Sequence, residues 1–302
     1  MPLKQKPDQN DYVSIPLGRT TWERTIAREP DIKIVNRYFE ETPTNLTGNV
    51  SMLLRPVLKR RTYVGTGPIR AVYQQDGVFD GDMFVVSGAE LWRVAKAPDT
   101  ADVVTQIVGG IHGDGVPYLT TAYVSGDTEY LWIADGNSLQ YYTDGAALLP
   151  CPLPDDVSAT SLDYIKGYVI VTVGAPFSQR FYWIQPGAIT VNPLDFAEAE
   201  SSLDPVLNVT TIGDQFWLFG TNTTEPWYVT GDAAAPMAPL EGRPFNRGIW
   251  PDTAVKVNDS VILVGQDGRV YDVTSGPNPI SYPGIEARIQ RAMDNQINGI
   301  NE

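Results

Sequence analysis

A pattern of four strands recurs five times between residues 67 and 283, and it limits the fold more than any other feature of the sequence. Each copy has an alternating first strand, an apolar second strand that ends at or near glycine, a third strand with Trp or Tyr near its middle, and a shorter fourth strand. The second strands are DMFVVSG (82–88), YLWIADG (130–136), YVIVTVG (168–174), QFWLFGT (215–221) and SVILVGQDG (260–268). The first strands begin near Pro68, Pro117, Ser158, Pro205 and Asp252, at spacings of 49, 41, 47 and 47 residues.

This repeat favours a β-propeller over a β-sandwich. A four-stranded unit with two apolar faces cannot bury both alone, whereas radial stacking on its neighbours buries both. β-branched and aromatic residues fill the strands, and Gly-Asp and Asp-Gly pairs at the joints supply the positive φ that tight hairpin turns require. The sequence therefore predicts an all-β fold, a propeller-like array of about five four-stranded blades. The repeat alone does not show whether the five blades close into a ring.

The chain divides into three predicted parts. Residues 1–66 form an extended basic N-terminal arm, residues 67–283 the blades, and residues 284–302 a short helical tail. The helix prediction rests on IEARIQRAMDNQI, where apolar residues recur at helical spacing. The tail is either the end of the fold or the start of a truncated continuation.

The charge is distributed unevenly between the arm and the blades. The formal net charge is -14, but residues 1–70 carry 12 Lys/Arg against 7 Asp/Glu, a balance of +5, and the other 232 residues carry 10 against 29, or -19. Such an acidic body repels nucleic acid, because Lys and Arg supply most non-specific affinity for phosphate. We expect the arm either to be solvated, to pair with the acidic body, or to dock on an acidic protein partner. The candidate partner-interface residues are Arg19, Arg24, Arg28, Arg37, Arg55, Lys59, Arg60 and Arg61.

The sequence predicts a protein that is made and kept in a cytoplasm. It has no apolar run of about 18 residues that could span a membrane, and its first residues, MPLKQKPDQND, lack the apolar core of a signal peptide. The single cysteine, Cys151, cannot form an intrachain disulfide, which agrees with a reducing compartment.

The residue types that catalysis requires are scarce, so we expect no enzyme, no cofactor and no metal site. His112 is the only histidine and lies in a predicted turn, GGIHGDG. A Ser/His/Asp triad would have to use it, yet the sequence has no G-x-S-x-G segment. One His and one Cys cannot complete a tetrahedral zinc site. The two glycine-rich stretches, GTGPIRA (65–71) and GGIHGDG (109–115), lack the spacing of a phosphate-binding loop.

Three weaker possibilities involve carboxylates and aromatic rings. Asp163, Asp204 and Asp214 lie near first strands, where propeller glycosidases place a catalytic pair, but a turn-forming role is the favoured interpretation. DGVFDGD (76–82) clusters carboxylates without the pattern of a calcium loop. A stripe of tryptophans fits blade packing better than a sugar-binding platform. These are Trp92, Trp132, Trp183, Trp217 and Trp227.

The order of motifs in the arm resembles the packaged DNA stabilisation proteins of short-tailed bacteriophages. The resemblance rests on Asn-Arg-Tyr-x-Glu at 36–40, Leu-x-Arg-Pro-x-Leu at 53–58, Gly-Pro-Ile-Arg at 67–70, RGIWPDTAV at 247–255 and Ile-Glu at 285–286. It spans residues 34 to 290. Val57 stands where the family's pattern leads us to expect glycine, and members of the family continue beyond the Ile-Glu pair.

The resemblance implies a non-enzymatic virion component, a tail accessory factor or tail hub that plugs the exit after genome packaging. Several copies, expected to be six, would surround the tail axis and contact one another. The expected partners are the portal or adaptor protein above and the needle, spike or fibre of the distal tail below. DNA would pass without specific binding, and no membrane would be bound. Assembly is expected in the host cytoplasm.

Two other classes of function remain open from the residues. A carbohydrate-binding or glycosidase-type propeller requires a carboxylate pair in the central channel and affinity for sugars. A cellular scaffold propeller would bind linear peptides on one face and would not need the basic arm.

Overall fold

A computed structural model describes residues 62–96, 102–113, 115–124, 128–199, 204–233, 235–242, 244–273 and 276–297, together with the backbone of 37–41 and 50–54. The chain separates into two compact units. One comprises Met1–Arg60 and Tyr282–Glu302, and the other comprises Arg61–Ser281.

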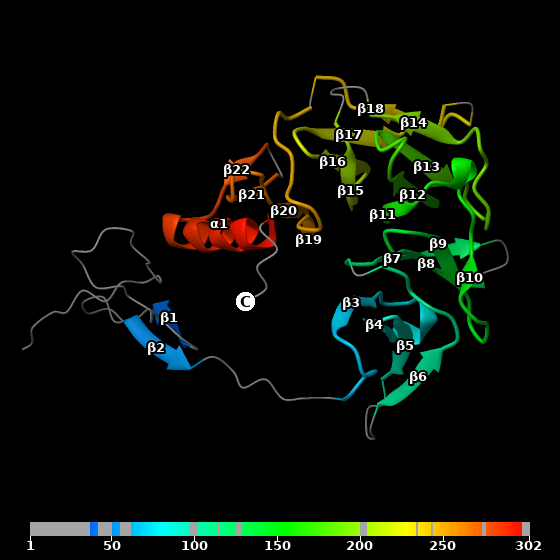
Figure 1. Cartoon of the computed structure of the whole chain (residues 1–302), viewed down its shortest axis with the longest axis horizontal. Helices are drawn as coiled ribbons and strands as arrows, with labels where there is room; N and C mark the ends of the chain where they lie inside the picture. The colour runs from blue at the N-terminus through cyan, green and yellow to red at the C-terminus, as the bar shows by residue number, and fades with distance from the viewer. Residues whose placement is uncertain are drawn as a thin grey trace, which may run out of the picture. The chain divides into compact units, whose positions relative to one another are not determined.

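The second unit contains five antiparallel sheets of four strands each, and every sheet runs in chain order (Figure 1). Blade 1 has β3 (Ile69–Gln74), β4 (Met83–Ser87), β5 (Glu90–Ala95) and β6 (Val103–Ile107), and blade 2 has β7 (Tyr118–Val124), β8 (Thr128–Ala134), β9 (Leu139–Tyr142) and β10 (Leu149–Pro150). Blade 3 has β11 (Ala159–Ile165), β12 (Tyr168–Val173), β13 (Arg180–Ile184) and β14 (Phe196–Glu198), and blade 4 has β15 (Val206–Ile212), β16 (Gln215–Gly220), β17 (Thr224–Val229) and β18 (Met237–Pro239). Blade 5 has β19 (Val255–Val257), β20 (Ser260–Val264), β21 (Val270–Asp272) and β22 (Asn278–Pro279). The predicted five-bladed β-propeller fold is confirmed.

The tight turns between the first and second strands follow from local sequence. β11 and β12 are joined by Lys166 and Gly167, which both have positive φ, 47° and 93°. Two consecutive residues with positive φ form the turn whose twist matches that of the flanking strands. Asn258, with a φ of 53°, begins the equivalent turn of blade 5.

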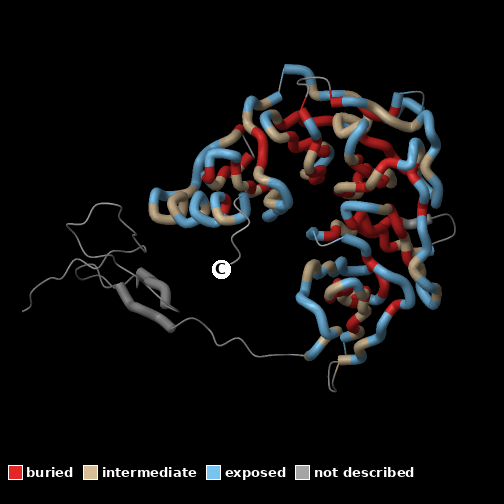
Figure 2. Tube along the Cα trace, in the orientation of Figure 1, coloured by how far each residue is buried: buried red, intermediate tan, exposed pale blue. Residues whose placement is uncertain are grey.

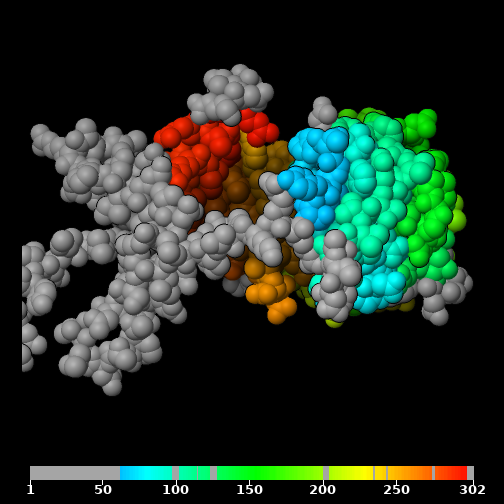
Figure 3. Space-filling model, turned by 90° about the horizontal axis from the view of Figure 1, so that it is seen from below, coloured from blue at the N-terminus to red at the C-terminus, as the bar shows by residue number. Residues whose placement is uncertain are grey.

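The core is divided among the junctions between consecutive blades, and Figure 2 colours the buried residues of the blades red. Four apolar clusters lie at the junctions 1–2, 2–3, 3–4 and 4–5. Among the residues that the structure describes, no cluster joins blade 5 to blade 1. In a space-filling view the surfaces of blades 1 and 2 adjoin directly (Figure 3).

The tryptophan stripe belongs to these junctions, as the blade-packing interpretation predicted. Trp132, Trp183, Trp217 and Trp227 are all buried, and each is a member of one of the junction clusters. Trp92 is only partly buried.

The first unit contributes one hairpin and one helix. β1 (Arg37–Glu41) pairs antiparallel with β2 (Val50–Leu54), and α1 (Pro283–Ile297) is the predicted C-terminal helix. Within the described ranges, no helix has the length and apolar character needed to span a membrane.

Candidate functional site

The basic residues selected from the sequence as partner-interface candidates fall in the arm. Arg19, Arg24, Arg28, Arg55, Lys59, Arg60 and Arg61 lie outside the described residues, and Arg37 is described only as a backbone position in β1. They remain predictions.

One end of the propeller carries a pocket at the centre of the blade array. We call this end the mouth; the turns between the second and third strands of blades 2 and 3 lie there. The pocket has a volume of about 570 Å³, and we call it the axial pocket. Its walls are mainly apolar and come from four consecutive blades, with Val116, Val173, Leu207 and Pro251 as representatives.

A hydrogen bond joins blade 2 to the loop before blade 5 at the mouth. The Tyr118 hydroxyl at the start of β7 donates to Asp252 Oδ1 in the loop before β19, at 2.9 Å. Burial, together with the neighbouring Asp252 carboxylate, raises the pKa of Tyr118 well above its usual value. Because the Tyr118 and Asp252 side chains meet across the space between blade 2 and the loop before β19, no duplex could pass between them, since its major groove alone is about 12 Å wide.

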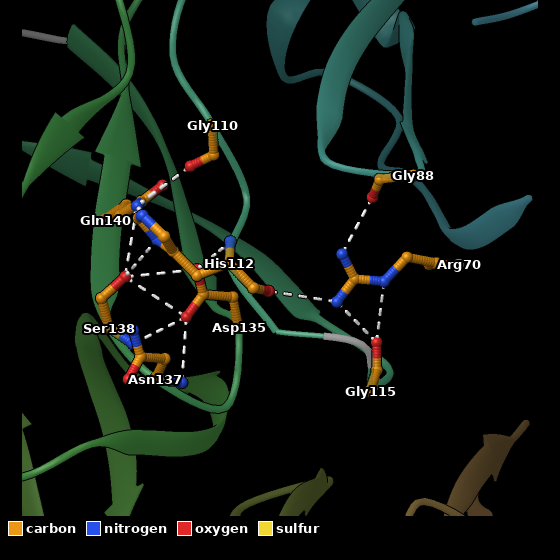
Figure 4. Close-up of polar contacts among 9 residues, drawn as sticks. All are labelled: Arg70, Gly88, Gly110, His112, Gly115, Asp135, Asn137, Ser138 and Gln140. Carbon is orange, nitrogen blue, oxygen red and sulfur yellow. Dashed lines mark hydrogen bonds and ion pairs between the residues drawn. The ribbon is translucent and has the colours of Figure 1, made fainter. Parts of the chain in front are cut away.

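Asp135 organises the turn between β8 and β9 (Figure 4). Its fully buried carboxylate accepts hydrogen bonds from the backbone N–H groups of His112 (2.8 Å), Asn137 (3.0 Å) and Ser138 (2.6 Å). Burial alone would raise the pKa of Asp135, but the three N–H donors outweigh it, so the pKa is lowered. The carboxylate therefore fixes both its own turn and the loop that carries His112.

His112, Asp135 and Ser138 do not form a catalytic triad, although they lie together (Figure 4). Asp135 Oδ2 lies 3.2 Å from His112 Nδ1, and Ser138 Oγ lies 3.4 Å from the same nitrogen. Gln140 Nε2 also lies 3.3 Å from this nitrogen. In a triad the two ring nitrogens serve different partners, one the acid and the other the nucleophile. The cluster therefore holds the loop.

Arg70 fastens the same loop to blade 1, a role that the sequence did not suggest. Its guanidinium donates to the carbonyl oxygens of Gly88 (2.9 Å), His112 (3.2 Å) and Gly115 (2.7 and 2.9 Å). The sequence feature that could have indicated this role is the position of Arg70 in the Gly-Pro-Ile-Arg segment, at the start of the first blade.

Polar side chains on the first strand of one blade accept hydrogen bonds from backbone N–H groups of the first strand of the next blade. Tyr73 accepts the backbone N–H of Thr121 at 3.1 Å, and Asp163 Oδ2 accepts that of Thr211 at 2.7 Å. Both pairs are 48 residues apart. Because a first strand is a sheet edge, its outward N–H groups need such acceptors.

The three candidate carboxylates near first strands have three different environments. Asp163 lies within β11, and burial raises its pKa even though Thr211 donates to it. Asp204 closes a turn by accepting the N–H groups of Asn222 (2.6 Å) and Thr223 (3.1 Å). Asp214 is exposed and pairs with Lys166 at 3.3 Å. The turn-forming interpretation holds for Asp204 and for Asp214, which lies in the turn between β15 and β16, and is wrong for Asp163, which belongs to a strand.

The segment DGVFDGD (76–82) contributes a carboxylate to an ion pair with Arg93. Asp82 pairs with Arg93 Nε at 2.6 Å, and Arg93 Nη1 also pairs with Asp144 of the next blade at 2.6 Å. Asp80 is almost fully exposed. Within the part of the chain that the structure describes, no group of three or more His, Cys, Asp or Glu side chains is placed to hold a metal ion.

Among solved structures, the chain is similar in fold to β-propellers. Virginiamycin B lyase from Staphylococcus aureus is 13% identical, with a TM-score of 0.50 over 73% of this chain and 72% of that chain. Hsv2 from Kluyveromyces lactis is 11% identical, with a TM-score of 0.43 over 75% and 65%. At this identity the likeness to the lyase shows the fold alone. No curated protein sequence matches the chain.

The family comparison is more informative. The model of the family described as "Bacteriophage P22 Gp10, beta-propeller" matches residues 33–301. This match confirms the resemblance drawn from the arm motifs. Because it covers most of the sequence, the chain belongs to this family and is a structural protein of a phage tail.

Proposed function

We propose that this chain joins the portal or adaptor complex of a short-tailed phage to the distal tail, and that copies of it around the tail axis plug the channel and retain packaged DNA. The observation that carries the proposal is the family match over residues 33–301. The role is structural and not enzymatic, which is supported by a histidine cluster whose geometry serves the fold. Assembly takes place in the host cytoplasm.

The bond between Tyr118 and Asp252 supports a conduit outside the individual propeller. A duplex cannot follow the axis of one chain at that level, so the channel is formed between copies. Several copies, six by the family resemblance, surround it. The acidic blades suit this place, because a negatively charged wall offers no phosphate-neutralising contacts that would hold passing DNA.

The basic arm carries a positive balance of charge, opposite in sign to that of the blades. Residues 1–70 have a balance of +5 within a chain of net charge -14. We assign the arm to contacts with acidic protein surfaces, either of the portal or adaptor or of a neighbouring copy, because complementary charge speeds and orients association.

Native mass spectrometry of the chain, alone and with the portal and adaptor complex of its phage, tests the proposal. We expect several copies to bind that complex, and the Arg60→Glu, Arg61→Glu double variant to bind more weakly. A matched control is Lys96→Glu, Lys256→Glu, which changes the net charge equally at exposed positions on the blades. A chain that never binds the complex, or that binds duplex DNA tightly at about 0.15 M salt, would contradict the proposal.

A further inference from the structure

The axial pocket has the size and chemistry of a binding site. Its volume of about 570 Å³ lies within the range of roughly 300–1,000 Å³ typical of ligand pockets. Val116, Val173, Leu207 and Pro251 supply apolar walls, and Asp252 supplies a carboxylate. Among the described residues that line the pocket none is aromatic, so these offer a sugar no ring to stack on.

Two glycines of the pocket wall lie against other atoms of the chain. A Cβ atom at Gly174 would clash with Ser158 Oγ, so the backbone packs directly against that side chain. Gly113 has a φ of +69°, and a Cβ there would lie 3.0 Å from the carbonyl oxygen of Asp135. Both wall positions therefore favour glycine, Gly174 because it packs against Ser158 and Gly113 because of its positive φ.

The chain itself contains a segment that matches this pocket. Residues 55–61, Arg-Pro-Val-Leu-Lys-Arg-Arg, place three apolar side chains between four cations, with no acidic residue. The other partner is a body whose residues 71–302 have a balance of -19. A proline-containing apolar segment docks well in apolar grooves, because its backbone loses little conformational freedom on binding.

The chain enters blade 1 at the same end as the pocket. The carbonyl oxygens of Gly67 and Pro68 accept hydrogen bonds from Ser87 Oγ (3.0 Å) and from the Gly88 N–H (2.8 Å). Gly88 in turn is held by Arg70, which also binds the mouth loop at Gly115. Residues 67 and 68, which follow the basic segment in the sequence, thus lie at the mouth end.

We propose that the axial pocket is the docking site for residues 55–61 of a second copy of this chain. The apolar Pro56, Val57 and Leu58 enter the pocket, and the flanking cations meet carboxylates of the blades, Asp252 among them. This inference rests on the proposed function, because it gives the arm's partner within an assembly of several copies.

Disulfide cross-linking between two full-length variants tests the docking site. One variant carries Val57→Cys and the other carries Asn137→Cys, at an exposed position that lines the pocket. The native thiol interferes little, since Cys151 is buried and burial raises its pKa to about 11. We expect at least about tenfold more mixed disulfide than with a Leu194→Cys partner, because docking raises the effective concentration of the two thiols.

Leu194 is a suitable control position because it is 81% exposed and does not line the pocket. Equal yields with the two partners would overturn the docking site. A chain carrying both Val57→Cys and Asn137→Cys that closes only an intrachain disulfide would assign the segment to its own propeller and overturn the second-copy occupant.

Binding to the portal and adaptor complex separates this inference from the proposed function. Chains that bind the complex but give no pocket cross-link overturn the docking site alone. Chains that give the cross-link but never bind the complex support the docking site and contradict the proposed function.

Discussion

The junction between blades 3 and 4 and the junction between blades 1 and 2 bury the same kind of surface with different side chains. At junction 3–4, the Phe181 ring packs edge-on against Trp227 and Phe216, at centroid distances of 5.0 and 5.5 Å. Junction 1–2 has a smaller aromatic group and a charged link to Asp144 from Arg93, whose side chain is largely buried. The charged link across junction 3–4, between Lys166 and Asp214, is more exposed. Junction 3–4 therefore depends mainly on aromatic volume and junction 1–2 also on a partly buried charge, so they should respond to different perturbations.

Phe181→Ala should give the largest loss of stability. The side chain is fully buried, and truncating a buried phenylalanine typically costs about 3–5 kcal/mol through lost transfer energy and the cavity left behind. Urea unfolding at neutral pH measures it, with Phe181→Leu as a control that keeps most of the apolar volume and loses less. A loss below about 1 kcal/mol would mean that the aromatic cluster is not tightly packed.

Asp135→Ala should cost about 2–3 kcal/mol, because three backbone N–H donors lose a buried acceptor. The lowered pKa fixes the pH dependence. The stabilisation by Asp135 is complete above the unfolded value of about 3.9 and is lost as the pH falls through the folded pKa. Unfolding of wild type and variant at pH 7 and at pH 3 should show the difference shrinking in acid. Asp135→Asn, which keeps one acceptor oxygen, is the control.

Arg93→Ala should cost about 1 kcal/mol, less than either change above. The Arg93 side chain is 16% exposed and its partner Asp82 is 8% exposed, so solvent screens the pair only in part. The loss should be smaller in 1 M salt, where the Debye length is about 3 Å and charge interactions are strongly screened. The Phe181→Ala loss should persist. Asp144→Ala removes a mostly exposed partner and should cost less than about 0.5 kcal/mol. Equal salt sensitivity of the two losses would remove the distinction between the junctions.

The repeat made the blades predictable, because apolar second strands that end at glycine recur with little variation. Predicted first strands begin one residue before the observed ones at Ile69, Tyr118, Ala159 and Val206. The fifth starts three residues later than predicted, at Val255, since Asp252 belongs to the preceding loop and has a positive φ of 59°.

The polar contacts at the mouth were not predictable from the same pattern. His112 and Asp135 meet across 23 residues, and Arg70 reaches Gly115 across 45. Such contacts depend on how loops fold back between blades, and hydrophobic periodicity reports only which face of a strand is buried. The basic arm was conspicuous in the sequence because of its charge, which says nothing of its geometry.

Asp163→Asn should change the stability little at neutral pH, and its pH dependence should be opposite to that of Asp135. Asn keeps an oxygen that can accept the Thr211 N–H, so we expect a change within about 1 kcal/mol at pH 7. Burial raises the pKa of Asp163, so the folded state binds its proton more tightly than the unfolded state does. That contribution is fully present below the unfolded value of about 3.9 and is lost as the pH rises through the folded pKa. Relative to the variant, wild type should therefore gain stability between pH 7 and pH 4, a range in which the Asp135 contribution is still complete. Urea unfolding of both proteins across this range measures the gain, and a wild-type advantage that grows toward pH 7 would mean that Asp163 is held ionised by its donors, as Asp135 is.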